Sequence, residues 1–173
     1  MNKLTITARG DREIIFTREF NAPRQLVFDA HTKPAMLTRW LGVGVVDGWT
    51  FAVCEVDLRV GGAYRWVWRG PNGEEMGMRG TYVEIAPPDR LVTTEKYDEP
   101  WYEGGATGTM ILTEAGGRTT MTTTMRYDSE AARDSVLASD MESGMVGGYN
   151  NLEAQLPAFA RERSASRGTA TSV

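Results

Sequence analysis

The sequence predicts an α+β domain: a curved antiparallel sheet of about seven strands, a long C-terminal helix and two short helices after the first strand. Three observations predict it: strand-like segments joined by short turns, an apolar stripe at helical spacing near the C-terminus, and two short helical segments near the N-terminus. A sheet that grips a single helix rarely packs solidly along its length. We therefore expect a cavity between helix and sheet.

The N-terminal part of the chain predicts one strand and then two short helices. Residues 12–20 mix β-branched and aromatic side chains with charges, as strands do. Asn21 is expected to cap the first helix, because Pro23 suits a first helical turn. A second helix is expected to start at Pro34 and to end at the glycines within residues 42–44.

From residue 49 onward the sequence changes to strands. Gly-Gly, Asn-Gly and Pro-containing turns separate segments that alternate or run apolar, which favours an antiparallel meander. The expected strands cover residues 49–58, 62–70, 74–86, 90–97, 106–114 and 118–126. The opening strand adds a further member to this sheet.

After Ser129 the chain is expected to become helical. The clearest part is one apolar stripe about four turns long. The stripe comprises Met141, Met145, Tyr149, Leu152 and Leu156. Pro157 is expected to mark the end of this helix, and the small, polar residues 161–173 are expected to be disordered. Residues 1–160 are thus predicted to form a single domain.

Composition argues against several classes of function. A net charge of −4 gives no basic surface, so nucleic acid is not an expected partner. No apolar run reaches the length of a membrane span, and charges interrupt every apolar stretch within residues 1–20, so we expect neither membrane association nor a signal peptide. The single cysteine, Cys54, rules out an internal disulfide and suits a reducing compartment, which predicts a cytoplasmic location.

Residues 57–69 are the most informative stretch of the chain. They predict two strands joined by a glycine turn, with Tyr64, Trp66 and Trp68 side by side on one face of the sheet. Such a surface either fills a core or lines an apolar cavity.

Several motifs within residues 12–157 together resemble one family. They are Phe20-Asn21-Ala22-Pro23-Arg24 with Val27-Phe28, Thr32-x-Pro34 with Trp40, Asp57-x-Arg59-x-Gly61-Gly62, Gly80-x-Tyr82-x-Glu84-Ile85-x-Pro87 and Arg90-Leu91-Val92. The chain resembles proteins similar to the C-terminal domain of the activator of the heat-shock 90 chaperone ATPase, within the START-like, helix-grip (SRPBCC) superfamily. The resemblance implies a helix-grip sheet around a hydrophobic cavity, and it connects the chain to the stress response. Members of that superfamily include lipid carriers, cyclases, hormone receptors and chaperone partners, so the fold does not fix the function.

Two positions depart from the family pattern. Gly147-Gly148-Tyr149 stands where the family usually carries Gly-Trp, and Trp40-Leu41 stands where a Trp pair is common. Both changes would alter side chains at the cavity or its rim, so the resemblance implies no ligand identity.

Candidate catalytic groups are few. His31 could share the inward face of Val27 and Phe28 and act as a polar anchor or general base. The favoured interpretation is a helix-end histidine bonded to the backbone or to water, because no second catalytic group is identifiable. Asp57 and Arg59 are expected to hold the adjacent turn. One histidine and one cysteine form no recognisable metal site, so neither metal nor cofactor is expected.

The apolar groups predict a ligand site instead. The candidate ligand-binding residues are His31, Trp40, Tyr64, Trp66, Trp68, Met78, Met110, Met121, Met141, Met145 and Tyr149. The leading hypothesis is a protein that binds an apolar or aromatic small molecule in the cavity. One alternative is a regulatory interaction module whose partner is a chaperone or a second copy of the chain. Another, with catalysis less favoured, is a cyclase-like enzyme using His31, Tyr149 or Asp57 for acid–base chemistry.

Overall fold

The computed structural model describes residues 2–42 and 48–169, with side chains up to residue 166. Within these residues eight strands form one antiparallel sheet in the order β1-β2-β8-β7-β6-β5-β4-β3. The strands are β1 (Thr5–Arg9), β2 (Glu13–Phe20), β3 (Thr50–Val56), β4 (Ala63–Arg69), β5 (Glu75–Ala86), β6 (Arg90–Tyr97), β7 (Ala106–Ala115) and β8 (Arg118–Tyr127). The helices are α1 (Arg24–Thr32), α2 (Pro34–Trp40), α3 (Glu130–Leu137) and α4 (Met141–Thr169).

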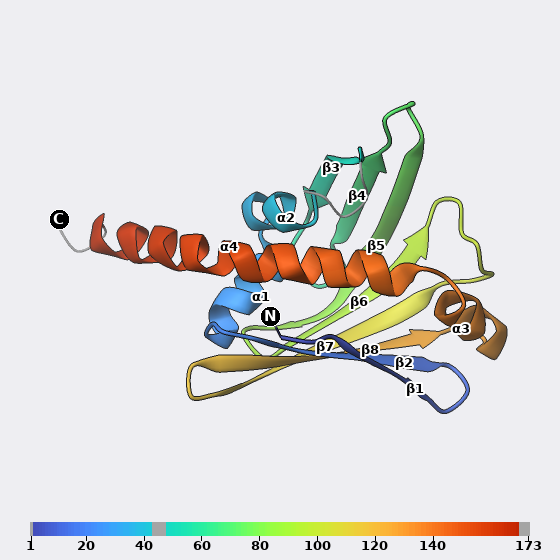
Figure 1. Cartoon of the computed structure of the whole chain (residues 1–173), viewed down its shortest axis with the longest axis horizontal. Coiled ribbons are helices and arrows are strands. Elements are labelled where there is room, and N and C mark those ends of the chain that lie inside the picture. The colour runs from blue at the N-terminus through green and yellow to red at the C-terminus, as the bar shows by residue number, and fades with distance from the viewer. Residues whose placement is uncertain (1, 43–47, 170–173) are drawn as a thin grey trace.

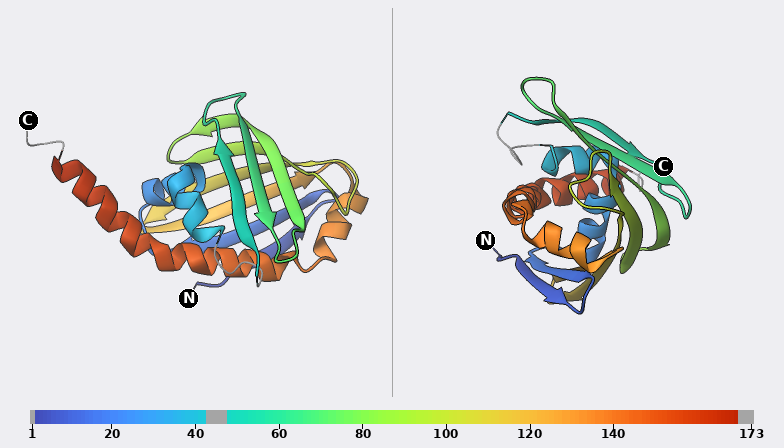
Figure 2. Two further views of the ribbon diagram at one scale, coloured as in Figure 1. Left: turned by 90° about the horizontal axis from the view of Figure 1, so that it is seen from above. Right: turned by 90° about the vertical axis from the view of Figure 1, so that its right-hand side faces the viewer.

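The sheet curves around α4. Figure 1 shows α4 crossing the concave side, with α1 and α2 toward one end of the sheet and α3 at the other. The end-on view in Figure 2 shows strands on two sides of the helices, and the last turns of α4 extend beyond the sheet. The predicted α+β, helix-grip architecture is confirmed.

One strand is present that the sequence did not predict. β1 pairs with β2 from Thr5↔Thr17 to Arg9↔Glu13. A tight turn joins the two strands, and in it Gly10 has a φ of 57°. β1 is a short edge strand with mostly exposed side chains, so it carries little of the alternating apolar pattern that identifies a strand. The sheet therefore has one strand more than the seven expected.

The start of α1 differs from the prediction. Pro23, and not Asn21, occupies the N-cap position, and it makes no side-chain capping bond. The Asn21 side chain instead donates to the Glu153 carboxylate of α4, with a nitrogen–oxygen distance of 3.4 Å. α2 ends at Trp40, close to the predicted stop at Gly42. Gly44, the other predicted stop, lies outside the described residues.

The C-terminal helix is longer than predicted. α4 continues through Pro157 to Thr169, so Pro157 does not end the helix and residues 161–169 are helical. Contacts beyond the proline hold it: the Arg39 guanidinium lies 4.5 Å from the Phe159 ring centroid and donates to the Glu162 carboxylate at 2.8 Å. These contacts offset the hydrogen bond that a proline cannot make. The rest of the predicted disordered tail, residues 170–173, lies outside the described residues.

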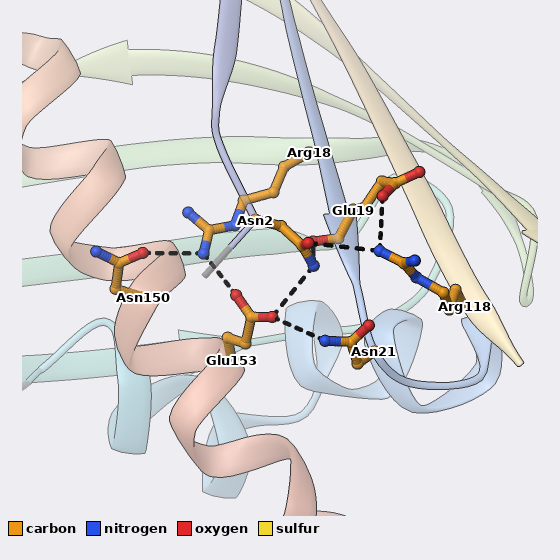
Figure 3. Close-up of polar contacts among 7 residues, drawn as sticks. All are labelled: Asn2, Arg18, Glu19, Asn21, Arg118, Asn150 and Glu153. Atoms are coloured by element: carbon orange, nitrogen blue, oxygen red, sulfur yellow. Dashed lines mark hydrogen bonds and ion pairs between the residues drawn. The ribbon is translucent and has the colours of Figure 1, made fainter.

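A buried polar cluster joins β2 to α4 (Figure 3). The Arg18 side chain is only 1% exposed, and its guanidinium donates to the Glu153 carboxylate at 2.8 Å and to the Asn150 side-chain oxygen at 2.9 Å. The other oxygen of that carboxylate accepts hydrogen bonds from the side chains of Asn2 and Asn21. A buried charge needs such partners, so the cluster fixes where α4 crosses the sheet.

Two hydrophobic clusters lie between the sheet and the helices. One gathers side chains of α1, α2, the second half of α4 and strands β4 to β8, and it includes Val27, Leu37 and Leu152. The other joins β2, β8 and α3 through residues such as Phe16 and Val136. Side chains of both clusters line the cavity described below.

Candidate functional site

A cavity of about 630 Å³ lies between the concave face of the sheet and α4. Its wall draws on β2, on strands β4 to β8, on all four helices and on the connections beside them. The volume falls in the range that holds a drug-sized ligand, and most of the wall is apolar.

The structure brings together all the predicted ligand-binding residues except one. His31, Trp40, Tyr64, Trp66, Trp68, Met78, Met110, Met141, Met145 and Tyr149 line the cavity. Met121 does not line it: its side chain is 0% exposed and packs in the core. Met121 pairs with Leu112 and Arg18 where α1 covers β7 and β8 directly, and no cavity forms there.

The aromatic side chains of β4 form one wall. The ring centroids of Tyr64 and Trp66 are 4.9 Å apart, and those of Trp66 and Trp68 are 6.3 Å apart in an edge-on arrangement. The Trp68 indole donates to the Leu41 carbonyl at 2.9 Å. The Trp66 indole nitrogen is buried without a hydrogen-bond partner among the described residues. The Trp66 indole N–H can therefore donate to a ligand, whereas the Trp68 indole N–H is already hydrogen-bonded within the protein.

His31 lies at the α1/α2 end of the cavity. Its Nδ1 is 2.7 Å from the Val27 carbonyl oxygen, so Nδ1 carries the proton and donates. Burial lowers the pKa of His31 to about 4, which keeps the ring neutral near pH 7. The Nε2 atom is a buried acceptor with no partner in the described part of the chain. The backbone bond that the sequence analysis favoured is present, and such a pKa does not suit a general base.

Tyr149 of α4 stacks on Trp40, with ring centroids 5.9 Å apart, and covers the same end of the cavity. Burial raises the pKa of Tyr149 to about 12, so its hydroxyl stays protonated.

Asp57, the remaining candidate for acid–base chemistry, does not line the cavity. Its half-exposed carboxylate pairs with Arg59 at 2.9 Å in the turn before β4. Gly62 is required in this turn, because a Cβ there would lie 2.1 Å from the Asp57 carbonyl oxygen.

Glu95 is the main site residue that the sequence analysis missed. It lies on β6 and shares the cavity face with Leu91, Thr93 and Tyr97, as strand alternation requires. Burial raises the pKa of its carboxyl group to about 7. Among the described residues, no hydrogen bond or ion pair to this carboxylate is present. The period-two alternation of residues 91–97 places Glu95 on the cavity face, but a charged residue was not expected in an apolar wall.

Tyrosines from four different segments surround Glu95. Burial raises the pKa values of Tyr64, Tyr97, Tyr102 and Tyr127, and the nearby Glu95 charge raises each of them further. The Tyr64 hydroxyl donates to the Thr94 carbonyl at 2.7 Å. The Tyr102 hydroxyl is buried and has no partner within the described residues. Of these four, only Tyr64 belonged to the predicted site.

The described residues contain no group of three or more histidine, cysteine, aspartate or glutamate side chains placed to hold a metal ion. Over the same residues, no helix combines the length and apolar character needed to cross a bilayer.

The sheet curved around α4, with an apolar cavity between them, defines a helix-grip protein of the START-like type. Residues 21–157 match the family described as "Activator of Hsp90 ATPase homolog 1-like protein". The chain belongs to this family.

Several solved structures are similar to this chain. A crystal structure of a Rhodobacter sphaeroides protein shares 33% identity with a TM-score of 0.83, covering 90% of this chain and 99% of that one. A Mycobacterium smegmatis crystal structure shares 23% identity with a TM-score of 0.77, covering 89% and 97% of the two chains. A solution structure of an AHSA1-like protein from Aeromonas hydrophila shares 20% identity with a TM-score of 0.62, covering 83% and 92%. The last two show the fold alone. No curated protein matches the sequence.

Proposed function

We propose that this protein binds an apolar or aromatic small molecule in the cavity between the sheet and α4. The observation that carries the proposal is the cavity of about 630 Å³, whose wall is mainly Trp, Tyr, Met and Leu side chains. Three buried polar atoms on or beside this wall lack partners in the described structure: Trp66 Nε1, His31 Nε2 and the Tyr102 hydroxyl oxygen. Buried polar groups normally have partners, so a ligand with a few polar groups would satisfy them.

Neighbouring glycines of α4 provide a matched test of this proposal. Gly148 is buried and lines the cavity, and a Cβ there would make ordinary contact with Trp40 at 3.7 Å. Gly147 does not line the cavity, and a Cβ there would meet nothing within 4 Å. We expect Gly148→Leu to fill cavity space and to weaken binding of the neutral probe N-phenyl-1-naphthylamine by about tenfold or more. Gly147→Leu should leave binding unchanged.

The measurement is the rise in probe fluorescence on titration, with thermal unfolding of each variant as the folding check. Both substitutions replace a helical glycine, so each should gain a similar helix stabilisation of up to about 1 kcal/mol. A folded Gly148→Leu variant that binds the probe as well as the parent does would contradict the proposed site.

A further inference from the structure

The charge of the cavity wall indicates what kind of ligand it accepts. Among the described lining residues, Glu95 and the exposed Asp140 are the carboxylates, and there is no lysine or arginine. Arg65, Arg79 and Lys96 border Glu95 in a second pocket on the outer face of the sheet, and both arginines pair with Asp98 there. The half-buried Glu95 thus has no ion-pair partner among the described residues, although a carboxylate in an apolar cavity wall favours a counter-ion.

The sheet register places small residues opposite Glu95, and the Tyr64 ring packs over one of them, Gly80, where a Cβ would lie 2.6 Å from the Tyr64 hydroxyl. Arg79↔Lys96 and Tyr82↔Thr93 pair β5 with β6 on either side, which places Gly80 opposite Glu95. On the other neighbouring strand Glu95 pairs with Ala106. Neither cross-strand neighbour has a side chain larger than a methyl group, so neither extends over the Glu95 carboxylate.

Aromatic rings surround this position from the neighbouring elements. Tyr64 of β4, Tyr127 of β8 and Tyr102 of the β6–β7 connection all lie near enough for the Glu95 charge to raise their pKa values, after the larger effect of burial. The rings of Tyr102 and Tyr127 pack edge-on with centroids 5.6 Å apart. A carboxylate among aromatic rings is suited to an ammonium ion, which ion-pairs with the carboxylate and is attracted to the ring faces. An anionic ligand would instead be repelled.

We propose that the cavity selects a cationic amphiphile, whose protonated amine or quaternary ammonium group binds Glu95 among Tyr64, Tyr102 and Tyr127. Its apolar or aromatic body extends along Trp66 toward His31 and Tyr149. This inference rests on the proposed ligand-binding function and adds the charge of the ligand to it.

Three probes that share one naphthalene body test the proposal at pH 8: 2-(2-naphthyl)ethylamine, 2-(2-naphthyl)ethanol and 2-naphthylacetate. Isothermal titration calorimetry measures their dissociation constants for the parent and for Glu95→Gln. The parent should bind the amine about tenfold or more tightly than the alcohol, and the acetate most weakly. In Glu95→Gln the preference for the amine should disappear, while the affinity for the alcohol stays within about threefold.

A quaternary probe, (2-naphthylmethyl)trimethylammonium, keeps its positive charge at every pH. Any pH dependence of its binding therefore comes from the titration of the protein. On the cavity side the titratable groups facing Glu95 are Tyr64 from β4, Tyr97 from β6, Tyr102, Tyr127 from β8 and Tyr149 from α4, with Asp140 at the rim and His31 at the far end. On the outer side of the sheet the charged groups that border it are Glu55, Arg65, Arg79, Lys96 and Asp128. Burial raises the pKa of each of these tyrosines above the ordinary value of 10, and that of His31 is about 4. Protonation of Glu95, whose pKa is about 7, should therefore weaken binding by about 10- to 30-fold between pH 8 and pH 5.5. Glu95→Gln should abolish most of this dependence.

The possible results distinguish this inference from the proposed function. If the alcohol or the acetate binds the parent as tightly as the amine, the cation preference is overturned and the cavity remains a ligand site. An amine preference that survives in a folded Glu95→Gln variant overturns the role of Glu95. If none of the three probes binds, both proposals are overturned.

Discussion

Replacing Arg18 with alanine should lower the free energy of unfolding by about 3–5 kcal/mol, because it removes one partner of a buried ion pair. Arg18 is 1% exposed and holds Glu153 of α4 at 2.8 Å, and its guanidinium also lies 5.6 Å from the Phe20 ring centroid. Without it, the Glu153 carboxylate keeps only amide donors (Figure 3). The loss therefore combines an uncompensated charge with a cavity in the core.

The same region provides a matched control. Arg118 donates to Glu19 at 2.8 Å, the same distance as in the buried pair, but both side chains are about half exposed. Arg118→Ala should cost less than about 1 kcal/mol, because water screens an exposed ion pair and replaces it readily. Urea unfolding followed by circular dichroism measures both variants. Equal losses in the two would show that burial does not determine the contribution of the Arg18 pair.

Local sequence patterns predicted most of the sheet, because strand alternation and turn residues are local properties. Residues 90–97 were predicted as a strand and form β6 with the same bounds. The long-range polar contacts were not predictable in this way. Arg18 and Glu153 lie 135 residues apart, and nothing in either segment indicates the other as its partner. The misassigned cap has the same cause, since Asn21 bonds to α4 and not to its own helix.

The candidate site was predictable to the extent that it is apolar. Tyr64, Trp66 and Trp68 line the cavity because alternation placed them on one face, and that face turned out to be the concave one. Glu95 obeys the same alternation, yet a charged residue normally indicates the solvent side of a strand. Only the curvature of the sheet and the crossing of α4 enclose its position. Its unusual environment is therefore a tertiary property, which a local pattern does not contain.

Glu95→Gln should make the protein more stable at pH 8, by about 2 kcal/mol, although it changes a residue of the candidate site. Burial raises the pKa of Glu95 from the ordinary value of 4.5 to about 7 in the folded protein. A carboxyl group whose pKa is higher when folded favours the folded state below the unfolded pKa, and this contribution is lost as the pH rises through the folded value. Glutamine cannot ionise, so it avoids the cost of burying a charge.

The stability difference between Glu95→Gln and the parent should depend on pH in a defined way. The stability difference between Glu95→Gln and the parent should be close to zero at pH 4, grow between about pH 4.5 and pH 7, and level off above pH 8. Urea unfolding at several pH values measures this difference, in which the titration of all other groups cancels. Glu84→Gln is the control, because Glu84 is exposed and pairs with Arg90 at 3.0 Å, and its difference should stay within about 0.5 kcal/mol throughout. A Glu95→Gln variant less stable than the parent at pH 8 would show that the carboxylate is already compensated within the protein. Such compensation would remove the energetic reason for a cationic ligand. A gain in stability of the variant would instead show that the parent keeps an unpaired carboxylate at a cost to its own stability, as is common for residues of a binding site.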